Sequence, residues 1–317
     1  MYSCSSVLRS LDFKFCKRGR REMMIDKEEI VLWRRRYLKE VRKQRRLGKT
    51  IYYMDETWVT AGHTVPKIWV DLTVKSSRDA WLKGLSCGLK EPSKGKRTIV
   101  VHIGSEKGFV ENGLFTMDSS KTGDYHEEMN AQVFEDWLAS VLPELDENAV
   151  IVMDNAPYHS RQIEKIPHSG WNKPEIVTWL TSKGVQADLS YLKAELLDMV
   201  ANLQCKPVYA VDEMVMASGR MVLRTPPYHC VLNPIELVWA NVKGFVARNN
   251  RTFKLPDTKQ LLLDGIAQVT PVQWKAVVDH VIDEVEMKMW EIDNIIEEID
   301  REIEPVIITF SSDEDDE

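Results

Sequence analysis

One short apolar run that ends in an acid constrains the fold more than any other feature of this chain. Ala149 to Met153 contains only apolar residues, and Asp154 follows directly. A run of this length and character is typical of a strand buried on both faces of a sheet. A carboxylate at its end is costly to desolvate unless it is paired, hydrogen-bonded or bound to a cation. The run therefore predicts a central strand that carries an acid into a polar site.

The segments around this run predict a mixed α/β architecture. Runs rich in β-branched and aromatic residues predict further strands at Ile51 to Val59, Ile68 to Val74, Thr98 to Ile103, Gly113 to Met117 and Met221 to Arg224. Helical periodicity predicts helices at Tyr125 to Leu142, Lys173 to Lys183, Tyr191 to Leu203, from Pro234 onward, and from Pro271 to Glu304. This order predicts a mixed sheet flanked by helices, with antiparallel strands first and a helical insert at about 160–219.

Two more acids occupy comparable positions. Asp55 lies within the first predicted strand, and Glu236 lies at the start of the helix that begins near Pro234. Taken singly, each of the three acids also has an ordinary structural interpretation as a turn residue or as a charge at a helix N-terminus. Taken together, three carboxylates without a His/Cys cluster predict a site for Mg²⁺ or Mn²⁺ rather than zinc.

Charge is distributed unevenly along the chain, although the net charge is only -7. Residues 14–49 contain 15 basic and 5 acidic residues, whereas residues 279–317 contain 2 basic and 16 acidic residues. The basic segment predicts an amphipathic helix that binds DNA phosphates without reading bases. The alternative is a solvated helix face. The residues expected to contact DNA are Arg34, Arg35, Arg42, Lys43, Arg45 and Arg46.

Three segments that contain the acids resemble a known family. They are Met54 to Trp58, Met153 to His159 and Pro226 to Trp239. Their order resembles the catalytic domain of DDE transposases of the mariner-like superfamily, across roughly 190 residues. The resemblance implies a ribonuclease H-like fold, with a helical insert before the last catalytic residue. It also implies that Asp55, Asp154 and Glu236 are the catalytic and metal-binding residues.

The resemblance further implies a reaction and its supporting groups. Two Mg²⁺ or Mn²⁺ ions would be held about 3.5 to 4 Å apart for phosphodiester cleavage at transposon ends, followed by strand transfer into target DNA. Asn155, His159 and Asn233 are expected to support the carboxylates or to face DNA. Two alternatives remain open: a domesticated or truncated transposase-derived protein that binds DNA without cutting it, and a metal-dependent nuclease that does not transpose.

The expected organisation departs from the family pattern in two ways. Asp154 and Glu236 are 82 residues apart, which the helical insert explains, and only about 50 residues precede the first strand. We therefore expect the paired helix-turn-helix modules of the family to be truncated. The expected divisions are a basic helical remnant at 1–49, a catalytic domain at 50–250, a helical region at 251–310 and an acidic tail at 311–317.

Composition narrows the cellular context and the partners. The five cysteines form no CxxC pair, so neither a disulfide framework nor a structural zinc site is expected. The sequence shows neither a secretory signal nor an apolar run of roughly 20 residues, so the protein is expected to be intracellular, without a membrane partner. The expected partner is double-stranded DNA, with a homodimer as an additional expectation, and a DNA substrate favours a nuclear location.

Overall fold

The computed structural model describes residues 25, 27–65, 76–83, 96–119 and 129–302. The predicted strand from Ile68 to Val74, the start of the predicted helix at Tyr125 and the tail at 311–317 lie outside the described residues. None of the helices in the described part is long and apolar enough to cross a membrane.

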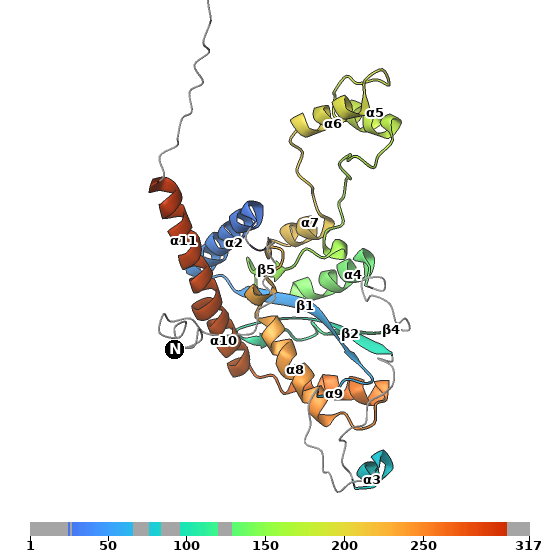
Figure 1. The fold of residues 1–317 in the computed structure, drawn as a ribbon, viewed down its shortest axis with the longest axis vertical. Coiled ribbons are helices and arrows are strands. Elements are labelled where there is room, and N and C mark those ends of the chain that lie inside the picture. The colour runs from blue at the N-terminus through green and yellow to red at the C-terminus, as the bar shows by residue number, and fades with distance from the viewer. Residues whose placement is uncertain (1–24, 26, 66–75, 84–95, 120–128, 303–317) are drawn as a thin grey trace, which may run out of the picture.

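The centre of the molecule is a mixed sheet (Figure 1). Its strands within the described ranges are β1 (Ile51–Thr60), β2 (Arg97–Ser105), β3 (Gly108–Phe109), β4 (Phe115–Ser119), β5 (Val150–Met153) and β6 (Met221–Arg224). Their order is β3-β2-β1-β5-β6, and β4 also pairs with β2. β1 runs antiparallel to β2 and parallel to β5, which is parallel to β6. The predicted strands within the described residues are therefore confirmed, with shifts of one or two residues at their ends.

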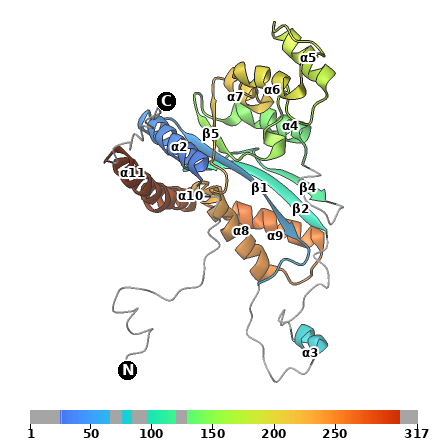
Figure 2. The same cartoon turned by 45° about the horizontal axis from the view of Figure 1, so that its top comes forward.

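Helices cover both faces of this sheet (Figure 2). α4 (Ala131–Val141) and α7 (Ala210–Ala217) pack on one face, and α8 (Ile235–Asn249) and α9 (Leu255–Ala267) pack on the other. Side chains alternate along β1, so Met54 packs with the α4 face and Tyr53 with the α8 face. Every residue of β5 is buried, as expected for a central strand.

The helices between β5 and β6 form the predicted insert. α5 (Lys173–Ser182) and α6 (Lys193–Asn202) pack against each other around Trp179, Leu180 and Leu196, with a small core of their own. They project away from the sheet, whereas α7 lies back against it (Figure 1). The short helices within the described residues are α3 (Ser77–Leu82), η3 (Leu142–Glu144), η4 (Pro157–His159) and η5 (Cys230–Leu232).

The two ends of the described chain pack together beside the sheet. α2 (Glu28–Arg46) lies along α11 (Met287–Glu302), which continues from α10 (Pro271–His280). The long helix predicted from Pro271 is present through the described residues, but it contains a π-helical segment, η6 (Val281–Glu286). The mean spacing of apolar residues does not reveal this local widening of the helix. Trp274 of α10 packs directly over Gly104 of β2, where a Cβ would lie 2.5 Å from the indole ring.

Candidate active site

Two parallel strands bring Asp55 and Asp154 to adjacent positions. Tyr53 of β1 pairs with Val152 of β5, and each acid lies two residues farther along its strand. The sequence separation of these acids therefore disappears in the sheet. Asp55 is half-buried, while Asp154 is exposed.

Glu236 approaches this pair from the first turn of α8. Burial, followed by the negative charges of Glu236, Glu56 and Asp154, raises the pKa of Asp55 well above its usual range. Glu236 is exposed by surface area. The surrounding protein nevertheless partly desolvates the Glu236 carboxylate, which raises its pKa. The charge of Lys243 opposes this rise, and the charge of Asp154 adds to it. The charges of Glu236 and Asp154 thus act on Asp55, and the charge of Asp154 acts on Glu236, at the carboxyl end of β5 and the amino end of α8.

His159 fixes the orientation of Asp154. Its side chain is buried, with Nδ1 2.7 Å from Oδ1 of Asp154 and Nε2 2.9 Å from Oε1 of Glu56. Burial alone would lower the pKa of His159, but the two carboxylates outweigh it and raise the pKa to about 9. The ring is therefore a cation at neutral pH and donates a hydrogen bond to each acid.

The two predicted asparagines support the backbone around the carboxylates. Nδ2 of Asn155 donates to the carbonyl of Thr225 at 2.7 Å, which joins the ends of β5 and β6. Nδ2 of Asn233 donates to the carbonyl of Met54 at 3.0 Å, directly before Asp55. Oδ1 of Asn233 is buried, and it has no hydrogen-bond partner among the described residues.

The sequence interpretation missed two groups at this site. Glu56 follows Asp55 directly in the sequence. It lies on the opposite face of β1, but it reaches Asp154 through His159. Lys243 lies two helical turns after Glu236, and its Nζ is 5.3 Å from the centre of the Trp58 ring. A spacing of seven residues on one helix was the available signal, because it places both side chains on the same face.

The oxygen ligands of Asp55, Asp154 and Glu236 suit a divalent cation, but the three side chains are not close enough together to bind one ion. Within the described ranges, no group of three or more His, Cys, Asp or Glu side chains is placed to hold an ion. Three features fit a cation: carboxylate donors, the raised pKa values of Asp55 and Glu236, and the unpaired Oδ1 of Asn233 nearby. A bound ion would have to draw the side chains closer together.

The structure corrects the expected DNA-binding role of two arginines in α2. Arg34 is 5% exposed and pairs with Asp293 of α11. Arg45 donates to both carboxylate oxygens of Glu286, at 2.6 and 2.7 Å. Arg34 is therefore enclosed in the helix packing, whereas Arg45 is held by Glu286 with its side chain 20% exposed. The sequence could not show this, because α11 follows α2 by more than 240 residues.

The other basic residues of α2 have different surroundings. Lys43 and Arg46 are exposed, and Arg35 is half-exposed. The Arg42 guanidinium lies 4.8 Å from the centre of the Trp290 ring and contacts Met287. A phosphate-binding role for these four residues remains a prediction.

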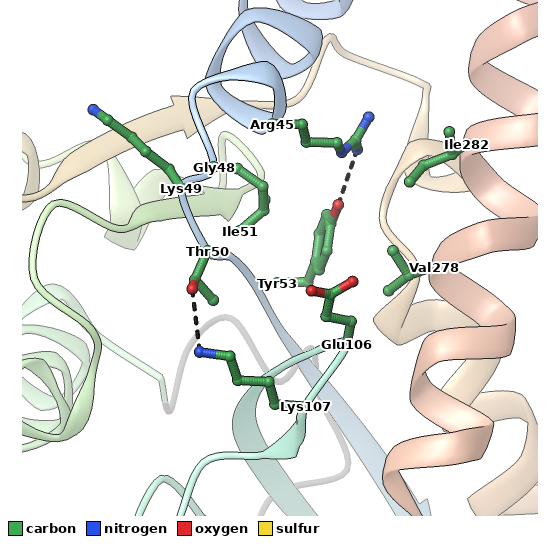
Figure 3. A pocket seen from close by; sticks show the side chains of 10 residues that line it. All are labelled: Arg45, Gly48, Lys49, Thr50, Ile51, Tyr53, Glu106, Lys107, Val278 and Ile282. Carbon is green, nitrogen blue, oxygen red and sulfur yellow. Dashed lines mark hydrogen bonds between the residues drawn. The ribbon is translucent and has the colours of Figure 1, made fainter.

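A cavity of about 370 Å³ lies at the amino end of β1 (Figure 3). Arg45 donates to the hydroxyl of Tyr53 at 3.0 Å, and Lys107 lies 3.4 Å from the hydroxyl of Thr50. Lys107 also pairs with Asp146 at 2.6 Å. None of the three candidate catalytic acids lines this cavity, so it is separate from the carboxylate site.

Comparison with known proteins gives consistent matches. Residues 93–260 match the family model described as "DDE superfamily endonuclease", a range that includes Asp154 and Glu236 but not Asp55. Two similar solved structures are the Mos1 transposase paired-end complex with left transposon end and the Mos1 mariner paired end complex with Mn. Each is 15% identical in sequence to this chain. Each match covers 91% of this chain and 69% of the Mos1 chain, with TM-scores of 0.56 and 0.57, respectively. The predicted ribonuclease H-like sheet is confirmed.

Proposed function

The chain belongs to the DDE superfamily of endonucleases, and on that premise we propose that it cuts DNA phosphodiester bonds and transfers the cut strand to target DNA. Its fold is similar to that of Mos1 transposase, and we propose that its activity is of the mariner type. The observation that carries the proposal is the convergence of Asp55 and Asp154 on neighbouring parallel strands, close enough to Glu236 for its charge to raise the pKa of Asp55 and for the charge of Asp154 to raise the pKa of Glu236.

The metal is part of this proposal. Asp55, Asp154 and Glu236 would hold Mg²⁺ or Mn²⁺, as two ions. When bound, the metal would activate the attacking water or 3′-hydroxyl and neutralise charge on the leaving oxygen. Two similar Mos1 paired end complexes are described with Mn and with Mg, respectively. Bound cations would also relieve the repulsion that raises the pKa of Asp55.

The other residues of the site would position the acids and the DNA. His159 contacts Oδ1 of Asp154 with one ring nitrogen and Glu56 with the other. The second oxygen of Asp154 is therefore directed away from the ring. Asn233 ties the start of α8 to β1 and so fixes Glu236 relative to Asp55. Lys243 supplies a positive charge beside these acids, where it would bind a phosphate of the substrate.

Double-stranded DNA is the proposed substrate, and transposon ends are its proposed specific form. One similar structure is a paired-end complex of Mos1 transposase with its left transposon end. Pairing of two ends would require two copies of this chain, so we include a homodimer in the proposal. A nuclear location is proposed with the DNA substrate.

A nicking and joining assay on purified protein tests the proposal. Labelled duplexes with candidate transposon ends and with random sequence would be incubated with Mg²⁺, Mn²⁺ or EDTA. Metal-dependent cleavage followed by joining to target DNA supports transposase activity. Cleavage without joining would indicate a nuclease, and DNA binding without cleavage would indicate a transposase-derived binding protein.

A further inference from the structure

A cavity of about 410 Å³ opens directly beside Asp154. Its walls come from Ile25, from the carboxyl ends of β5 and β6, and from the loop after β6, which contributes Pro226, Pro227, Tyr228 and His229. The volume lies within the range of about 300–1,000 Å³ that is typical of small-ligand sites. Asp154 is the only carboxylate among the described residues of this lining, and two prolines and a tyrosine supply flat apolar surface.

The tyrosine in this wall occupies a backbone position that favours glycine. The amide of His229 donates to the carbonyl of Pro226 at 3.2 Å, closing a four-residue turn with Pro227 and Tyr228 at its centre. Tyr228 has φ = 64°, the left-handed value that the third residue of a type II turn requires. A bulky side chain in this conformation is strained, because its Cβ crowds the backbone. Nevertheless, Tyr228 is 51% exposed, so packing does not explain the choice of residue.

A buried chain of polar contacts holds the turn in place. Nδ1 of His229 lies 2.7 Å from the carbonyl of Pro227, and its Nε2 lies 3.1 Å from Nη1 of Arg34. Arg34 in turn pairs with Asp293. His229 and Asp293 are each 1% exposed. The strained turn is therefore fixed from α2 and α11, and Tyr228 is presented at the cavity in a set position.

We propose that this cavity binds one unpaired nucleotide of the DNA strand held at Asp154, with the Tyr228 ring stacked on its base. The proposal rests on the DNA-cutting function proposed above and adds a subsite to it. The chemistry of the described lining favours a base over a phosphate, because these residues offer apolar faces and place an acid, Asp154, rather than a cation beside the bound group. An aromatic ring at a glycine-favouring position is then explained by stacking.

The test compares binding of three DNA probes by fluorescence anisotropy in Ca²⁺. The probes are a blunt duplex, the same duplex with one unpaired 3′ nucleotide, and the same overhang with an abasic nucleotide. We expect the native chain to bind the base-bearing overhang about 5- to 100-fold more tightly than either other probe, the range set by one base stacked on an aromatic ring. Equal binding of all three probes by the native chain would overturn the proposal.

Two variants of the tyrosine separate stacking from folding. Tyr228→Gly relieves the turn, so its melting temperature should equal or exceed that of the native chain, while its preference for the base-bearing overhang disappears. Tyr228→Phe keeps the ring and should keep the preference. Val231→Ala is the matched control, because Val231 is also 51% exposed on the same loop but does not line the cavity. An overhang preference that survives in Tyr228→Gly would refute the subsite.

These measurements do not depend on cleavage. If the native chain shows the overhang preference and Tyr228→Gly loses it, the subsite stands even when the nicking assay shows no cutting. If the chain cuts DNA but the preference is absent or unaffected by Tyr228→Gly, the proposed function stands and the subsite falls.

Discussion

Nη1 of Arg34 lies 3.1 Å from Nε2 of His229, although 195 residues separate them in sequence. The rest of the guanidinium binds Asp293, with Nε 3.0 Å from Oδ2 and Nη2 on Oδ1. One arginine from α2 therefore connects α11 to the loop that precedes Glu236. The sequence predicts that Arg34 contacts DNA. In the structure, Arg34 instead holds the loop that leads to Glu236.

The first prediction concerns this buried pair. Arg34→Ala leaves the Asp293 carboxylate buried without its partner, which should lower the free energy of unfolding by about 3–5 kcal/mol. Combining Arg34→Met with Asp293→Leu should recover most of this stability, because no buried charge remains. Urea unfolding measures both effects, with exposed Arg36→Ala as the control. A decrease below about 1 kcal/mol in Arg34→Ala, the range of an exposed ion pair, would show that the pair is not enclosed as described.

The second prediction concerns the remaining basic residues of α2. Neutralising Arg35, Arg42, Lys43 and Arg46 together should weaken binding to all duplexes alike, because phosphate binding carries no sequence information. The slope of log affinity against log salt should become shallower by about 0.9 for each phosphate that the variant no longer neutralises. Titrations of a candidate transposon end and a random duplex at several salt concentrations measure this. Selective loss of preference for one sequence would instead identify α2 as a recognition helix.

The third prediction tests the carboxylate site. Asp154→Asn should reduce metal-dependent cleavage on the order of 1,000-fold or more, since it removes a ligand charge beside Asp55. DNA affinity should remain within about twofold of native, because the basic surface is unchanged. Gel assays of cleavage and binding measure the two quantities, with Asp188→Asn on the exposed insert as the control. Undiminished nicking in Asp154→Asn would place the activity elsewhere.

Local pattern was sufficient to predict most of the sheet. The strand Met221–Arg224 and the buried strand ending before Asp154 were predicted with boundaries that agree within one residue, because apolar runs bounded by polar residues have few alternatives. The convergence of Asp55 and Asp154 could be anticipated only through the family resemblance. Local periodicity cannot predict that strands whose paired residues are 99 positions apart will lie side by side.

Interactions between distant segments account for the errors and omissions. Arg34 and Arg45 lie on a helix whose sequence is strongly basic, and only the folded structure shows that distant acids, Asp293 and Glu286, pair with them. The bridge from Glu56 through His159 spans 103 residues. The π-helical segment around Glu286 could not be predicted, because the average spacing of apolar residues does not change detectably when one helical turn is widened.

The fourth prediction concerns acid stability. His102 of β2 is buried and stacks on Phe109, with ring centres 4.0 Å apart. Burial lowers the pKa of His102 to about 3, so its neutral form stabilises the folded state above the unfolded pKa of about 6.5. This contribution declines as the pH falls from about 6.5 toward 3, by about 2–3 kcal/mol at pH 4.5.

Replacement of the imidazole isolates this effect from the other titrating groups. His102→Phe keeps a ring against Phe109 but cannot accept a proton. The free energy of unfolding of the native chain should therefore fall relative to that of the variant between pH 7 and pH 4.5. Urea unfolding at the two pH values measures this difference. Parallel decreases in both proteins would show that His102 can be protonated without cost in the folded chain.

The fifth prediction concerns Lys243, which connects α8 to the face of Trp58. Burial lowers the pKa of Lys243, and the charges of Glu236 and Asp55 oppose this change. The effect of both acids indicates that the ammonium lies near the carboxylates that would meet the substrate. A cation fixed there stabilises charge that develops on a phosphate during cleavage. Lys243→Ala should therefore slow single-turnover cleavage roughly 100-fold, whereas Lys243→Arg should retain most of the rate. Arg248→Ala, an exposed change on the same helix, is the control. If Lys243→Ala and Lys243→Arg lose rate equally and both lower the melting temperature, the lysine serves packing against Trp58 rather than the reaction.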